Sequence, residues 1–201
     1  MIDRQLPTRA LTPSGVALLR VPGDRWASVA VHVVAAFGVG GLIAAVFFDG
    51  AAVAVFALVL GGLTLIRVLQ LPALLQVALG LAMQAAAWAS MLRWYEQYWW
   101  LDIVAHLVVN GLLAGAAGVV LHRAQMTPSR AARAGRWGSV ITTTGVGGLL
   151  AVVWEVAEWF GYVYVDRTID IAPGDTVGDL AAGVVGSVIA GLVLVRRRGW
   201  Q

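Results

Sequence analysis

The stretch LDIVAHLVVNGLLAGAAGVVL, residues 101–121, decides the fold class of this chain. It is long and apolar enough to cross a bilayer as a helix, which needs about 20 such residues. Asp102 and His106 nevertheless lie within it, four positions apart. Because this spacing is about one helical turn, both side chains point the same way. The stretch therefore predicts a membrane helix that carries an acid and an imidazole.

The composition of the whole chain supports a membrane protein. Its 201 residues are 60% hydrophobic and only 12% charged, and the mean hydropathy is +0.81. Soluble globular proteins carry roughly 25% charged residues. The chain has no cysteine, which excludes disulfides and thiolate metal ligands. Its net charge of +3 comes from arginines near the predicted membrane edges, so nucleic acid is not an expected partner.

Six stretches qualify as membrane spans. They are residues 27–48, 51–66, 72–92, 101–121, 140–160 and 176–195. The sequence thus predicts an all-α, integral membrane domain over 27–195, preceded by a mobile basic tail at 1–26 and followed by a basic end at 196–201. The first span is too long for a signal peptide and has no convincing cleavage site.

The arginines predict the orientation of the six helices. If the helices alternate in direction, twelve of the 14 arginines fall on one side and only Arg93 and Arg167 on the other. Cytoplasmic loops are enriched in Lys and Arg, so both termini are expected in the cytoplasm. The location predicted from this is a bacterial inner membrane, with Asp102 and His106 near its outer leaflet.

Three predicted spans each bring two ionisable groups, about one turn apart, to the same outer depth. The pairs are Asp102 and His106, Glu155 and Glu158, and Asp175 and Asp179. A structural explanation exists for three of them: Asp175 as a helix N-cap, Asp102 as a dipole partner, and Glu158 as a side chain that reaches the headgroups. The deeper residues, His106, Glu155 and Asp179, need another explanation, because a charged group inside a span costs several kcal/mol unless it is paired, neutralised or hydrated.

Five carboxylates face one imidazole in this prediction, and no arginine lies in the outer halves of these spans. Either several carboxylates are protonated, or a cation lies among them. Imidazole together with carboxylate oxygens suits a divalent metal such as zinc or manganese, and an oxygen-only subset suits magnesium. The predicted metal ligands are Asp102, His106, Glu155, Asp175 and Asp179, and the predicted catalytic groups are Glu155 and Glu158.

These motifs carry a resemblance to a known family. The patterns D-x-x-x-H at 102–106, E-x-x-E-W at 155–159 and D-T-x-x-D at 175–179 resemble the YjdF-like bacterial inner-membrane proteins, whose function is unknown. More distantly, the chain is similar to VanZ-like proteins, which hints at cell-envelope glycopeptide or lipid biology. The family usually has another Asp shortly before its last motif. Ala172 and Pro173 stand there in this chain, and Asp170 is a displaced candidate.

Three functions follow from this pattern as hypotheses. The first is a metal-dependent hydrolase or transferase that acts on a lipid or lipid-linked substrate, since a bound divalent ion polarises phosphoryl or acyl oxygens. The second is a cation or proton-coupled transporter, since intramembrane carboxylates also mark ion paths. The third is a non-catalytic membrane subunit in which the acidic cluster only fixes helix packing.

Overall fold

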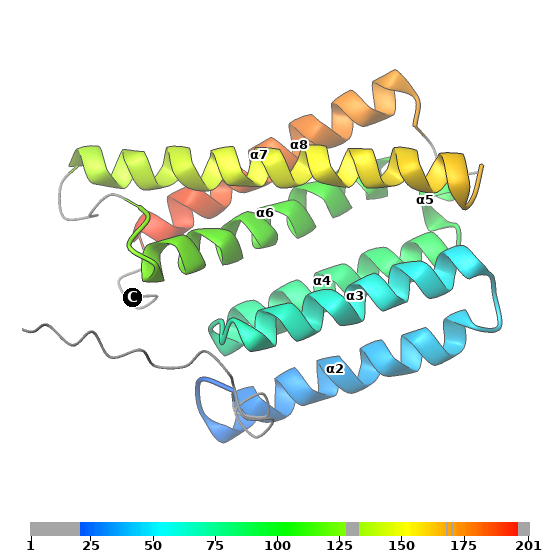
Figure 1. Ribbon diagram of the computed structural model, residues 1–201, viewed down its shortest axis with the longest axis horizontal. Coiled ribbons are helices and arrows are strands. Elements are labelled where there is room, and N and C mark those ends of the chain that lie inside the picture. The colour runs from blue at the N-terminus through cyan, green and yellow to red at the C-terminus, as the bar shows by residue number, and fades with distance from the viewer. Residues whose placement is uncertain (1–20, 128–132, 168, 170, 197–201) are drawn as a thin grey trace, which may run out of the picture.

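The computed structural model describes residues 21–127, 133–167, 169 and 171–196, and every regular element in these ranges is an α-helix (Figure 1). The helices are α2 (Arg25–Ala45), α3 (Gly50–Val68), α4 (Ala73–Met91), α5 (Trp94–Gln97), α6 (Trp99–Arg123), α7 (Arg133–Tyr164) and α8 (Pro173–Arg196). All except the four-residue α5 are long and apolar enough to cross a membrane. The predicted fold class, with six membrane-spanning helices, is confirmed.

The helix ends differ from the predicted spans mainly at α5 and α7. Helix α5, which no sequence pattern predicted, follows Arg93, a residue in the left-handed region at φ 57°. Helix α7 has 32 residues, about 48 Å at 1.5 Å per residue, and so extends well beyond the predicted span 140–160. Its first turns carry Arg133 and Arg136 and are too polar for a hydropathy window to include.

Aspartates begin the first two spans. The Asp24 carboxylate accepts a hydrogen bond from the Ala27 amide at 2.8 Å, and Asp49 accepts one from Ala52 at 2.7 Å. Each bond satisfies an amide that the first turn of a helix leaves without an intrahelical partner. The short connection between α2 and α3 therefore ends at Asp49, which caps α3.

The spans form two groups of three that lie side by side (Figure 1). We call α2, α3 and α4 the amino-terminal trio, and α6, α7 and α8 the carboxy-terminal trio. Within the carboxy-terminal trio, α8 packs closely on both α6 and α7. Contact between the trios runs chiefly through α4 and α6, where Leu75 and Leu79 join a buried apolar cluster with Val119 and Leu194.

Small residues bring α6 and α8 close together. A Cβ added at Gly111 would lie 2.9 Å from the carbonyl oxygen of Gly186, and one added at Gly186 would collide with the Leu107 carbonyl oxygen. The two helices therefore meet backbone to backbone, as small residues allow in membranes. One turn along α6 from His106, the Asn110 side chain crosses this junction and bonds to both other helices of the trio.

The arginine-rich helix ends share one end of the bundle. The described arginines there are Arg25, Arg67, Arg123, Arg133, Arg136 and Arg196. Arg93 and Arg167 follow α4 and α7 at the opposite end. The cytoplasmic location of both termini remains a prediction. Most of the predicted mobile tail, most of the basic C-terminal end and Asp170 lie outside the described residues. Arg25 and Trp26, which were assigned to that tail, belong to α2.

Candidate metal centre

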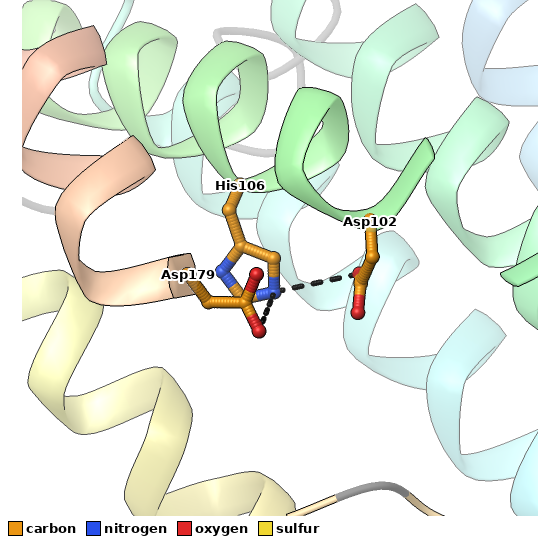
Figure 2. A group of neighbouring side chains, drawn as sticks. All are labelled: Asp102, His106 and Asp179. Carbon is orange, nitrogen blue, oxygen red and sulfur yellow. Dashed lines mark ion pairs between the residues drawn. The ribbon is translucent and has the colours of Figure 1, made fainter. Parts of the chain in front are cut away.

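The candidate centre lies at the arginine-poor end of the carboxy-terminal trio. Helix α6 begins there at Trp99, so Asp102 falls in its first turn and His106 in its second. Helix α8 also begins there, and it presents Asp179 from its second turn. Figure 2 shows these three side chains converging from the two helices that pack most closely.

The Nε2 atom of His106 faces two carboxylates. It lies 3.6 Å from Oδ1 of Asp102 and 3.7 Å from Oδ2 of Asp179. Asp102 and His106 share one face of α6, as the four-residue spacing predicted. The contact with Asp179 is tertiary and depends on the close packing of α6 and α8.

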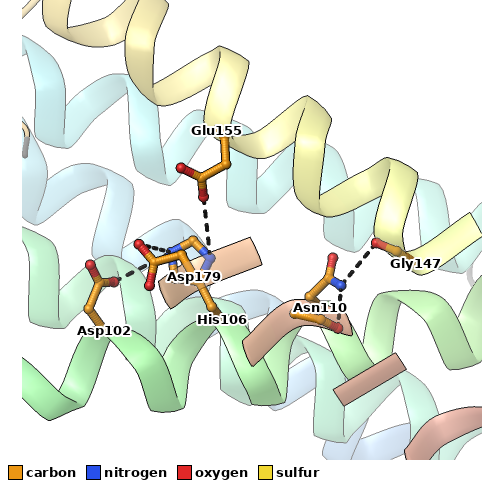
Figure 3. Close-up of polar contacts among 7 residues, drawn as sticks. Asp102, His106, Asn110, Gly147, Glu155 and Asp179 are labelled. Carbon is orange, nitrogen blue, oxygen red and sulfur yellow. Dashed lines mark hydrogen bonds and ion pairs between the residues drawn. The ribbon is translucent and has the colours of Figure 1, made fainter. Parts of the chain in front are cut away.

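The other ring nitrogen faces α7. Nδ1 of His106 lies 3.8 Å from Oε1 of Glu155, and Figure 3 shows Glu155 approaching the imidazole from the side opposite Asp102 and Asp179. Oε1 of Glu155 is buried and has no hydrogen-bond partner among the described residues. His106, Glu155 and Glu158 also offer ligand atoms within 4.8 Å of one another.

These separations differ from hydrogen-bond distances. A hydrogen bond from an imidazole nitrogen to oxygen is about 2.7–3.2 Å long. Two ligands that share a tetrahedral zinc ion at 2.0–2.1 Å are held about 3.3–3.5 Å apart. The Nε2 contacts, at 3.6 and 3.7 Å, are therefore nearer to the spacing of two ligands on one ion. Asp102, His106 and Asp179 offer ligand atoms that all lie within 4.8 Å of one another.

Burial raises the free-energy cost of the charges in this group. The Asp179 side chain is 1% exposed, His106 8% and Glu155 12%, whereas Asp102 is 27% exposed. With Glu158, four carboxylates thus offer oxygens within 4.8 Å of one imidazole, which carries at most one positive charge. A divalent cation on Nε2 would offset the Asp102 and Asp179 charges. The greater exposure of Asp102 leaves that edge of the group the most accessible.

Asp175 is placed differently from the other predicted ligands. The metal-competent groups in the described part of the chain do not include it. Helix α8 begins at Pro173, three residues earlier than the N-cap interpretation requires, so Asp175 lies inside the first turn. Proline favours the first helical position because its missing N–H would have no partner there. An acid in that turn is instead favoured by the helix dipole.

Tyr95 is a neighbour of the centre that the sequence analysis did not single out. It lies on α5, and its hydroxyl donates to the Ala86 carbonyl of α4 at 3.2 Å. Burial, and then the negative charges of Asp102, Glu158 and Asp179, raise the pKa of the Tyr95 hydroxyl. The phenol is therefore neutral at physiological pH. Nothing in the local pattern of α5 would have revealed this proximity, because it depends on how α4 meets α6.

Below the centre, Asn110 closes the interior of the trio. Its Nδ2 lies 3.0 Å from the Gly147 carbonyl oxygen (Figure 3). It also lies 2.9 Å from the Gly183 carbonyl oxygen and 3.0 Å from Oγ of Ser187. One amide thereby links α6 to both α7 and α8. Its position directly beneath His106 fixes the separation of the helices that bring His106 and Asp179 together.

Fold and site together define a multi-pass helical membrane protein with a histidine–carboxylate cluster inside one end of its bundle. The chain belongs to the family described as "Predicted membrane protein (DUF2238)", whose family model matches residues 25–199. This membership is consistent with the YjdF-like resemblance noted from the motifs. No curated protein and no solved structure matches the chain.

Proposed function

We propose that the protein is a membrane metalloprotein whose divalent ion is held by His106, Asp102 and Asp179, and that it acts as a hydrolase or transferase on a lipid or lipid-linked substrate. The observation that carries the metal is the position of His106 Nε2, 3.6 and 3.7 Å from two carboxylate oxygens of different helices. One nitrogen with two carboxylates suits zinc or manganese better than magnesium, which prefers oxygen ligands.

In this proposal Glu155 is a positioning residue. A single ion takes one nitrogen of an imidazole, and metal-bound histidines usually donate their other N–H to a carboxylate. Glu155 Oε1 faces that other nitrogen at 3.8 Å. We assign Glu155 the orienting role, in place of the ligand role predicted from sequence, because it faces the nitrogen that Asp102 and Asp179 do not; the two atoms would have to move closer to form a hydrogen bond. Glu158, one turn nearer the helix end, is then the candidate general base, and Asp175 is left as a supporting charge.

The substrate class follows from the depth and accessibility of the centre. The ion would lie near one membrane face, beside the interfacial aromatic residues Trp99, Trp100 and Trp159, each at least half exposed. Lipid headgroups occupy that depth, and a bound divalent ion can polarise a phosphoryl or acyl oxygen and activate water. The arginine distribution supports an outward-facing centre, and a lipid or lipid-linked molecule is the proposed partner.

Metal content tests the centre directly. The full chain, purified in detergent, is analysed by plasma mass spectrometry beside His106→Ala and Asp179→Asn. We expect about one equivalent of divalent metal in the unaltered protein and less than a tenth of that in either variant. His32→Ala is the matched control, since His32 lies on α2 and bonds only within its own helix turn, to the Ser28 carbonyl at 2.7 Å.

Each result has a defined meaning. If both centre variants retain metal, the metal is bound at another site. Protein that stays metal-free after reloading with zinc, manganese and magnesium would overturn the metalloprotein proposal. Size-exclusion chromatography of each variant separates loss of metal from loss of fold. If the loaded protein releases product from lipid phosphates or lipid esters and both variants do not, the enzymatic part of the proposal is supported.

Orientation has its own test, since the chain has no native cysteine. Gly174→Cys places a thiol in open space at the end of the bundle that carries the centre, and Ala134→Cys places one at the arginine-rich end. A membrane-impermeant maleimide applied to intact cells should label Cys at 174 and not at 134. The reverse pattern would place the centre at the cytoplasmic face.

A transporter is the second candidate, favoured by buried polar groups that continue beyond Asn110. Ser187, Thr143 and Ser139 are each 1% exposed or less, within the carboxy-terminal trio. They extend from the centre toward the arginine-rich end, as an ion path would require. Proteoliposomes loaded with a metal- or pH-sensitive dye distinguish the two functions. Flux that His106→Ala abolishes, without any lipid turnover, would favour transport.

A further inference from the structure

Arg93 and Arg167 are the two arginines of the described chain that lie at the same end as the candidate metal centre. The excess of arginine at the other end has an explanation in membrane topology, and these two residues have none. They come from different connections, one between α4 and α5 and one after α7. Both nevertheless line one open cavity of about 570 Å³.

The cavity offers a defined set of polar groups. The Arg93 guanidinium pairs with Glu96, with Nη2 2.6 Å from Oε1. The Arg167 guanidinium lies over the ring of Tyr162, 4.9 Å from its centroid, a cation–π arrangement that holds it in place. Ile169, Ile171 and Ala172 complete the lining.

The charge of this lining favours an anion. Among its described lining residues are two guanidinium groups and one carboxylate, so one positive charge remains in this described part after the pairing of Arg93 with Glu96. Asp166 also acts electrostatically on Arg93, but it does not line the cavity. A guanidinium has five N–H donors in a planar fork, and one carboxylate leaves several of them available to a second acceptor.

We propose that Arg93 and Arg167 form a binding site for a phosphate group at the membrane surface. Two guanidinium groups match the several acceptor oxygens of a phosphate, which arginine binds in bidentate fashion. The site lies beside Trp94, Tyr98 and Tyr164, each at least 44% exposed, as expected of aromatic residues at headgroup level. Headgroup depth and an arginine-lined cavity together favour a lipid phosphate as the source.

The backbone conformation of Arg93 determines how its side chain meets Glu96. It adopts φ 57° and ψ 33°, a left-handed conformation that non-glycine residues seldom adopt. The bend ends α4 and directs the chain into α5, whose Glu96 then meets the Arg93 guanidinium. The same left-handed conformation follows α3 at Gln70 and α6 at Gln125, so it marks the end of a helix.

This site does not depend on the metal centre, because none of its lining residues is a proposed ligand. If both proposals hold, the substrate of the centre belongs to the phosphate-bearing lipids. If the metal proposal fails, phosphate binding at this cavity is unaffected. Metal analysis of His106→Ala and Asp179→Asn and phosphate titration of the arginine variants are separate measurements, so either proposal can fail while the other holds.

Calorimetric titration of the full chain in detergent tests the site. The probes are dihexanoyl phosphatidic acid, dihexanoylglycerol, which has the same tails without phosphate, and inorganic phosphate. We expect saturable binding of the phosphatidic acid and none of the dihexanoylglycerol. Arg93→Gln/Arg167→Gln should weaken binding at least tenfold. The matched control Arg133→Gln/Arg136→Gln removes two exposed arginines from the other end and should change it less than twofold.

The probes distinguish the source of the phosphate. If inorganic phosphate binds as tightly as the phosphatidic acid, and the double variant loses both, the ligand is a free phosphate. The proposal is overturned if neither phosphate probe binds, or if the double variant binds as the unaltered protein does. If the glutamine variant does not fold, Arg93→Lys/Arg167→Lys replaces it. This variant keeps both positive charges but lacks the planar guanidinium groups, so it tests whether their geometry is needed for binding.

Glu96→Gln provides a test by gain of binding. It removes the carboxylate that competes for Arg93 and raises the net charge of the lining by one. We expect phosphatidic acid to bind severalfold more tightly to this variant. A purely structural pair between Arg93 and Glu96 would predict no such gain, so unchanged or weaker binding would count against the site.

Discussion

The two trios of this protein are joined along one seam but are packed by different means. In the amino-terminal trio, large side chains fill the interior: Phe56 is fully buried, its ring meets Trp88 edge to face at 5.4 Å between centroids, and Phe37 stacks on Trp88 at 6.0 Å. In the carboxy-terminal trio, glycines allow backbone contact between α6 and α8. The first arrangement separates helices, and the second draws them together.

The difference shows what a buried polar centre requires. Asp179 and His106 come from different helices, and their side chains meet only because α6 and α8 approach so closely. Aromatic packing of the kind seen around Trp88 would hold two such helices too far apart. The trio that carries the centre therefore gives up large apolar side chains for small residues and hydrogen bonds, whereas the other trio contains no comparable centre in the described residues.

Gly186→Val is the sharpest way to break this comparison. The added side chain would collide with the Leu107 carbonyl oxygen, which is backbone and cannot rotate away. Overpacking typically costs 1–3 kcal/mol, and a backbone obstacle places this variant at about 3 kcal/mol or more. We expect loss of most folded protein, measured by size-exclusion chromatography and by the thermal unfolding midpoint in detergent. A variant as stable as the unaltered protein would contradict backbone contact between α6 and α8.

Glu155→Gln tests the centre itself and should have a smaller effect than Gly186→Val. The amide keeps the volume of the side chain but binds the Nδ1 proton of His106 less strongly than a carboxylate does. Loss of such an orienting partner typically lowers metal affinity 10–100-fold. We therefore expect weaker binding with an unchanged stoichiometry, measured by competition with a metal-sensitive chelator. Complete loss of metal would instead indicate that Glu155 is itself a ligand.

Sequence patterns could predict those features of this protein that depend on local spacing. The six spans follow from length and hydropathy, and the pairing of Asp102 with His106 follows from one helical turn. The depth argument also placed Glu155, Glu158 and Asp179 at the end of the bundle where the structure brings them together. All of these features depend only on distance along a helix axis.

Features that depend on rotation about the helix axes or on helix ends could not be predicted this way. Which nitrogen of His106 faces Glu155 is set by how α7 is turned against α6. Tyr95 approaches the centre through α5, a single turn too short to give a periodic pattern. The prediction of Asp175 as an N-cap was wrong because the helix begins at Pro173, before the start of the span predicted from hydropathy.

Asn110→Ala and Gln84→Ala compare hydrogen bonding in the two trios. The Asn110 amide has three acceptors on α7 and α8, whereas the Gln84 amide donates one bond, to the Val34 carbonyl of α2 at 2.8 Å. Side-chain hydrogen bonds between membrane helices average about 0.6 kcal/mol. Because the Asn110 NH2 group can donate two bonds at once, we expect losses of about 1.2 kcal/mol for Asn110→Ala and about 0.6 kcal/mol for Gln84→Ala. Unfolding in a graded detergent mixture measures both, and equal losses would remove this contrast between the trios.

Gly40→Ala and Gly61→Ala should have the smallest effect, and they define how special the close contact of Gly186 is. Both glycines lie in helices of the amino-terminal trio, and a Cβ at either position meets no atom within 4 Å. Alanine also restricts the unfolded chain, which typically favours the helix by about 0.5–1 kcal/mol. We therefore expect unfolding midpoints equal to or slightly above that of the unaltered protein. A marked loss at either position would mean that an exposed face of the amino-terminal trio is covered by a partner helix, and the contrast between the trios would then hold only within a single chain.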